Sequence, residues 1–147
     1  NFTPVIAIAL FAGVYLRRSH ALIVPLALMM ITDVVIGLHS VVLFTWGSVL
    51  LISLIGLWLK KSPGMKNTIF SSLVSALLFF IVTNIGVFLM HYYPYNWAGL
   101  SECFTLAIPF FRATLVSTLV YTVVLFGGYE FLAARIRNTR LAPVLLK

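Results

Sequence analysis

Long apolar segments constrain this chain more than any other feature of its sequence. They fill most of the chain between Phe2 and Leu132, and short polar or basic stretches such as "KKSPGMK" separate them. A helix needs roughly 20 mostly apolar residues to cross a membrane. With 62% hydrophobic and only 9% charged residues, the chain lacks the polar surface that a soluble globule requires. The sequence therefore predicts an all-α fold, a polytopic helical membrane protein.

The apolar segments predict five transmembrane helices in one domain that spans residues 1–147. The predicted helices cover residues 2–16, 21–38, 41–59, 68–90 and 112–132. Pro109 and Arg112 interrupt the last apolar segment, and proline removes a hydrogen bond from a helix. We therefore expect a separate short helix over residues 101–109, which lies at the outer face as a half-helix.

The basic residues predict how the helices are oriented. With five crossings, every Lys and Arg except Arg112 falls on one side, which the positive-inside rule makes cytoplasmic. We therefore expect a multi-pass protein of the cytoplasmic (inner) membrane with a cytoplasmic C-terminus. The net charge of +7 does not indicate nucleic acid, because the basic residues form no stripe with interleaved aromatics. The basic C-terminal tail, from Phe131 to Lys147, is expected to rest on membrane lipids, with a partner site as the alternative.

Asp33 fits the apolar pattern least, because a lone carboxylate inside an apolar helix is costly. At about 1.5 Å per residue, Asp33 and Asn84 lie at a similar depth below the outer ends of their helices. Arg112 is the only Lys or Arg that does not fall on the predicted cytoplasmic side. It is therefore the expected counter-ion of Asp33 or Glu102. The candidate substrate-binding residues of this outer region are Asp33, His39, Trp46, Asn84, His91, Glu102 and Arg112.

Two interpretations of this polar region are open at the level of sequence. Asp33 and Arg112 could form a buried ion pair that fixes helix packing, with Asn84 as a hydrogen-bonded link between helices. Alternatively, these side chains line a water-accessible cavity that holds a polar ligand.

No catalytic or metal-binding group is predicted. The histidines, Asp33, Glu102 and Cys103 lack the spacing of a known zinc or di-iron motif. The chain also has no glycine-rich loop that could hold a phosphate. We therefore expect no enzyme activity, no metal site and no cofactor.

Ala9, Ala12 and Gly13 form a strip of small residues at helical spacing in the first predicted helix. Such strips let another helix approach closely. Either the strip packs within this chain, or it is the face on which a partner membrane protein docks.

Five segments carry a family resemblance that covers the chain from Asn1 to about Gly128. They are "NFTPVIAIALFAG", "TDVVIGLHS", "VTNIGVFL", "WAGLSECF" and "IPFFRATL". In this order they resemble a bacterial membrane-protein family of unknown function. Members of that family are regarded as transport proteins, similar to the substrate-binding S components of energy-coupling factor (ECF) transporters.

The resemblance implies a six-helix fold that lacks its first helix here, in a bacterial membrane. S components bind a vitamin-like molecule or a metal ion near the outer face. They dock on a transmembrane partner protein through small residues of helix 1, which correspond here to Ala9 and Gly13. A pair of ATPases supplies the energy for transport. After the arginine of the segment "IPFFRATL", the family often has Asn and, further along, an acidic residue. At these positions this chain has Ala113 and then Ser117 or Thr118. The substrate of relatives therefore does not transfer to this chain.

These observations predict a substrate-binding membrane subunit of an uptake transporter, with an outward-facing polar pocket. The alternative is a non-catalytic structural or accessory subunit of a larger membrane protein complex. A lid over the pocket would favour the first function. A polar cluster filled by its own side chains would favour the second.

Overall fold

The computed structural model describes residues 2–137. Asn1 and residues 138–147 lie outside the described part, and so does most of the tail that is expected to contact lipid. Within residues 2–137 every regular element is a helix and no strand occurs, which confirms the predicted all-α polytopic fold. The elements are α1 (Val5–Tyr15), α2 (Arg18–Ile36), α3 (Val42–Leu59), α4 (Met65–Leu89), α5 (Trp97–Thr122), a π-helical segment η1 (Val123–Gly127) and α6 (Gly128–Ile136).

Four helical segments of the described chain are long and apolar enough to cross a membrane. They are α2, α3, α4 and the continuous rod from Trp97 to Ile136. α1 is different, because its 11 residues rise only about 16 Å, roughly half the thickness of the hydrocarbon core. The helix expected over residues 2–16 is therefore too short to cross a membrane by itself. Pro4 precedes its first turn, and the backbone is extended again at Leu16.

α1 lies in the interior of the bundle, where it contacts α2, α3, α4 and α5. Ala9 and Leu10 are completely shielded from solvent. Its closest neighbour is α3, because a Cβ atom on Gly13 would lie 2.5 Å from the carbonyl oxygen of Ser53 and 2.6 Å from the Cα of Gly56. The two backbones therefore touch, as small residues allow. A helix that is apolar on every side is stable when it is covered on every side.

α5 runs through Pro109 without a break, which overturns the expected boundary at that proline. The short helix expected over residues 101–109 is instead the first part of α5. Proline removes one backbone hydrogen bond, but packing against α4 holds the axis on both sides of it. The ring of Phe80 on α4 lies 5.6 Å from that of Phe104 and 4.7 Å from that of Phe111. One side chain thus joins the two halves of α5.

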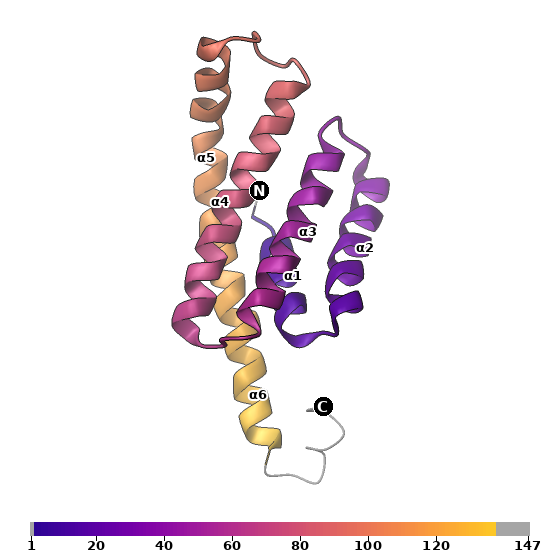
Figure 1. Cartoon of the computed structure of the whole chain (residues 1–147), viewed down its shortest axis with the longest axis vertical. Coiled ribbons are helices and arrows are strands. Elements are labelled where there is room, and N and C mark those ends of the chain that lie inside the picture. Colours follow the sequence, from indigo (N-terminus) through magenta and orange to yellow (C-terminus); the bar gives the residue numbers. More distant parts are fainter. Residues whose placement is uncertain (1, 138–147) are drawn as a thin grey trace.

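The connections between helices sort to opposite ends of the bundle (Figure 1). The α1–α2 and α3–α4 connections lie at the same end as α6, and the α2–α3 and α4–α5 connections lie at the other end. The first is named the basic end, because it carries the described basic residues apart from Arg112: Arg17, Arg18, Lys60, Lys61, Lys66, Arg135 and Arg137. The other is named the aromatic end, after Tyr92, Tyr93, Tyr95 and Trp97 of the α4–α5 connection and the start of α5.

Candidate functional site

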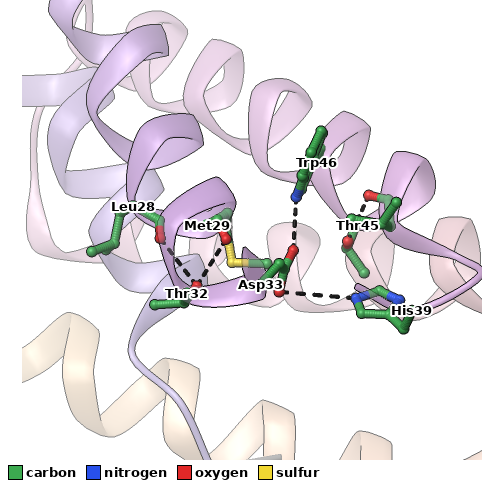
Figure 2. Close-up of polar contacts among 8 residues, drawn as sticks. Leu28, Met29, Thr32, Asp33, His39, Thr45 and Trp46 are labelled. Carbon is green, nitrogen blue, oxygen red and sulfur yellow. Dashed lines mark hydrogen bonds and ion pairs between the residues drawn. The ribbon is translucent and has the colours of Figure 1, made fainter. Parts of the chain in front are cut away.

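Asp33 lies in the last turn of α2, and side chains from beyond that helix satisfy its carboxylate. The indole N–H of Trp46 on α3 donates to Oδ2 at 2.7 Å, and Nε2 of His39 lies 4.0 Å from Oδ1 (Figure 2). Only 8% of Asp33 is exposed. A short hydrogen bond to a charged acceptor is a strong one, so it offsets much of the cost of burying the carboxylate. The structure therefore brings three predicted site residues together in one cluster between α2 and α3.

The ion pair expected between Asp33 and Arg112 is not formed. Asp33 faces α3, whereas Arg112 lies on α5, which packs mainly against α4 and α1. Arg112 is also not at the start of a helix, because α5 begins at Trp97. Its side chain is exposed on the outside of the bundle, and no ionic partner for it occurs among residues 2–137. The two charged groups thus belong to different faces of the protein.

A cavity of about 320 Å³ lies at the N-terminal end of α1, between α3, α4 and α5. It exists because α1 is too short to fill the centre of the bundle along its whole length. Figure 1 shows α1 beginning part-way up the bundle, with α4 and α5 continuing far beyond it. The polar lining residues are Thr3, Thr45, Thr83, Asn84 and Thr114, and the aromatic ones are Phe79, Phe80, Phe110 and Phe111.

Four of the five polar side chains that line the cavity, all except Thr3, have already used a donor proton within their own helices. Thr45, Thr83, Thr114 and Asn84 each donate to a carbonyl oxygen of the preceding turn at 2.7–3.0 Å. A threonine hydroxyl has one proton, so its oxygen keeps only the capacity to accept. Asn84 keeps its carbonyl oxygen and one N–H. The cavity therefore offers mainly hydrogen-bond acceptors beside flat apolar rings.

Most of the predicted site residues lie away from this cavity. Asn84 lines it, but Asp33, His39 and Trp46 form their own cluster. The ring of His91 stacks on that of Tyr95 at the exposed aromatic end, with centroids 5.2 Å apart. Glu102 is exposed near the start of α5, and Arg112 is exposed further along it. No three His, Cys, Asp or Glu side chains of the described chain come together to hold a metal ion.

Sequence reasoning did not select most of the residues that line the cavity. Thr83 is adjacent to Asn84 and lies at the same depth, so the depth argument could have found it. Thr114 is two positions beyond Arg112, on a segment that was expected to start a new helix. The phenylalanine rings carried no usable signal, because phenylalanine occurs in nearly every apolar segment of the chain.

The small-residue strip of α1, for which both internal packing and partner docking were open, is covered by the chain itself. Ala9 and Ala12 are buried, and Gly13 meets the backbone of α3. The internal-packing interpretation therefore holds for this strip, and Ala9, Ala12 and Gly13 offer no face to another protein. The reason is the central position of α1, which sequence spacing could not reveal.

Comparison with known proteins places the chain in a family. The family model described as "Family of unknown function (DUF6580)" matches residues 1–141. No curated protein and no solved structure gives a significant match. The family match covers both the Asp33 cluster and all residues that line the cavity. The chain therefore belongs to DUF6580, a family of unknown function.

Proposed function

We propose that this chain is the substrate-binding membrane subunit of an uptake system, and that the cavity at the start of α1 receives the substrate. The observation that carries the proposal is the cavity itself. Its volume of about 320 Å³ falls at the lower end of the range for small-molecule sites. Polar and aromatic side chains from several helices converge there, as in other binding sites between helices.

The lining defines the chemistry of the proposed substrate. Acceptor oxygens on Thr83, Asn84 and Thr114 favour a molecule that carries N–H or O–H donors. Phenylalanine rings from α4 and α5 favour a substrate with a flat apolar part. The lining residues include no carboxylate, imidazole or thiolate, which are the side chains that hold most metal ions. Of the two expected ligand classes, we therefore keep the vitamin-like molecule rather than the metal ion.

The proposed orientation places the basic end in the cytoplasm, by the positive-inside rule. The cavity then lies nearer the outer face of a bacterial inner membrane. Such a subunit needs a membrane partner and a source of energy, as the S components of ECF transporters do. The buried strip on α1 does not supply the contact surface for that partner, so another face must.

The proposal is tested by native mass spectrometry of the protein purified from its own membranes. The wild-type chain should carry a small molecule, and a variant with Asn84→Leu should lose it, because leucine removes the acceptor oxygen and the free N–H of Asn84 from the cavity wall. Thr32→Val is the matched control, since the hydroxyl of Thr32 bonds within α2, away from the cavity. A ligand-free wild-type protein, or a ligand that Asn84→Leu retains, would contradict the proposal.

Arg112 favours a second function, that of an accessory subunit in a larger membrane complex. Its neighbour Phe111 packs on Phe80, about midway along α4, so Arg112 lies deep within the apolar part of the bundle. An exposed arginine at that depth is costly unless it meets a carboxylate or water. A partner helix with an acidic residue would satisfy it. Loss of a stoichiometric partner in Arg112→Leu, but not in Arg135→Leu at the basic end, would support this function.

A further inference from the structure

The basic end carries more positive charge than the described chain neutralises. Beside its seven Lys and Arg residues, Glu130 is the only acidic residue that residues 2–137 place at this end. Its carboxylate accepts a hydrogen bond from the hydroxyl of Tyr15 at 2.8 Å. Within the same range, no Lys or Arg forms an ion pair with a carboxylate. The positive charge of this end is therefore available to anions from outside the chain.

Two of these basic residues line one cavity of about 360 Å³. Arg18 is the first residue of α2, and Lys61 follows the end of α3. The remaining lining residues all belong to α3: Leu54, Leu57 and Trp58. The cavity thus lies at the basic end, where α2 starts and α3 ends (Figure 1). It shares no lining residue with the cavity at the start of α1.

The lining changes from charged to apolar with depth in the bundle. Arg18 and Lys61 are exposed at the rim. Leu54 lies four residues before Trp58 on α3 and is thus about 6 Å deeper. Trp58 is 66% exposed and Leu54 is 46% exposed, so apolar surface below the rim is open to the surroundings of the bundle. A molecule that fits this lining has a negative group at one end and an apolar body.

Trp58 connects the charged and apolar parts of the cavity. No residue of the described chain accepts a hydrogen bond from its indole N–H. Tryptophan is enriched at membrane interfaces, where its ring contacts apolar chains and its N–H meets polar groups. The N–H of Trp58 is therefore available to an oxygen of a lipid headgroup.

An anionic phospholipid matches both parts of the cavity. Arginine and lysine bind phosphate through charge-assisted hydrogen bonds, and basic pockets between transmembrane helices bind anionic headgroups. A free phosphate ion would use Arg18 and Lys61 but leave the apolar surface of Leu54 and Trp58 uncovered. That surface belongs to α3, a helix long and apolar enough to cross a membrane, so acyl chains are its natural neighbours.

We propose that this cavity binds one anionic phospholipid, with its phosphate between Arg18 and Lys61 and an acyl chain against Leu54 and Leu57. The lipid contacts both α2 and α3 and so stabilises their packing at the basic end. A ligand that binds only the folded protein raises its Tm. This site does not rest on the proposed substrate or on the cavity at the start of α1.

Native mass spectrometry of the delipidated protein in detergent tests the proposal. Phosphatidylglycerol and phosphatidylcholine with the same acyl chains are titrated in parallel. We expect one phosphatidylglycerol per chain, bound at least about tenfold more tightly than phosphatidylcholine, and a higher Tm in its presence. Arg18→Gln combined with Lys61→Gln should weaken this binding about 30-fold, because each basic side chain contributes about fivefold.

Arg17→Gln combined with Lys66→Gln is the matched control. It removes the same charge from the same end, at two residues that do not line this cavity. Because charge at a distance is screened, we expect this control to weaken binding less than about threefold. Circular dichroism establishes that each variant is folded. If the variant with both lining changes is not, Lys61→Gln alone decides, with an expected loss of about fivefold.

Four results would overturn the proposal. Equal losses in the two pairs of changes would mean that the basic end attracts lipid only by its overall charge. Equal affinity for the two lipids would mean that the headgroup is not recognised. Displacement of phosphatidylglycerol by millimolar inorganic phosphate would identify the site as one for a free anion. Co-purification of an acidic protein that only the Arg18 and Lys61 changes abolish would assign the cavity to a protein partner.

Discussion

Replacing Trp46 by Phe should reveal how the bundle tolerates the carboxylate of Asp33. Phenylalanine keeps a flat apolar ring but lacks the indole N–H that donates to Oδ2 at 2.7 Å. A hydrogen bond to a charged group contributes about 1.5–3 kcal/mol, and more is lost when a buried acceptor is left without a partner. We therefore expect Trp46→Phe to lower the free energy of unfolding by about 2–3 kcal/mol.

His39→Gln is the matched comparison, because His39 is the other partner of the same carboxylate. Its Nε2 lies 4.0 Å from Oδ1, and 41% of its side chain is exposed. Exposed ion pairs contribute about 0–1 kcal/mol, since water and salt screen them. We therefore expect His39→Gln to cost less than about 1 kcal/mol.

The measurement is unfolding in detergent followed by circular dichroism, since fluorescence would change with the loss of Trp46 itself. Asp33→Asn completes a double-mutant cycle with Trp46→Phe, and the coupling energy isolates the contribution of this pair. Direct contact predicts coupling of about 1 kcal/mol or more. If His39→Gln costs as much as Trp46→Phe, or if the cycle shows no coupling, the hydrogen bond does not hold the carboxylate.

Two further predictions concern packing and orientation. Gly13→Ala should destabilise the protein by about 1–3 kcal/mol, because its methyl group would meet the backbone of α3. Gly47→Ala has open space around it and should be neutral or slightly stabilising, so equal effects of the two changes would contradict the close approach of α1 and α3. In a Cys103→Ala chain in intact cells, a membrane-impermeant thiol reagent should label Tyr92→Cys and leave Lys61→Cys unlabelled. The reverse pattern would show that the basic end faces outwards.

The helical nature of the chain follows from its sequence alone. A segment in a bilayer has no water to satisfy its backbone, so an apolar segment must form its own hydrogen bonds as a helix. The apolar segment at residues 41–59 is helical from Val42 to Leu59 for this reason. The positions of the basic residues also follow from the sequence alone, because basic residues between apolar segments must lie at the ends of helices. Both properties can be read without knowing which helices are neighbours.

The cluster around Asp33 needed the tertiary structure. Spacing in the sequence measures the depth of a residue along its helix, but not the direction in which its side chain points. Asp33 and Arg112 therefore seemed suitable partners, yet the packing of α2 on α3 turns Asp33 towards Trp46. The depth argument found Asp33 but led to Arg112 as its partner, whereas the structure shows Trp46.

Neighbouring helices also decide what Gly13 contacts and whether Pro109 ends a helix. A small-residue strip can meet its own chain or another protein, and the central position of α1 directs Gly13 to α3. Proline can end a helix or be tolerated within it, and the ring of Phe80 on α4 supports α5 on both sides of Pro109. Local sequence determines that these apolar segments form helices, but neighbouring helices decide where a helix such as α5 begins and ends. Packing between helices decides their rotation, and rotation decides which side chains meet.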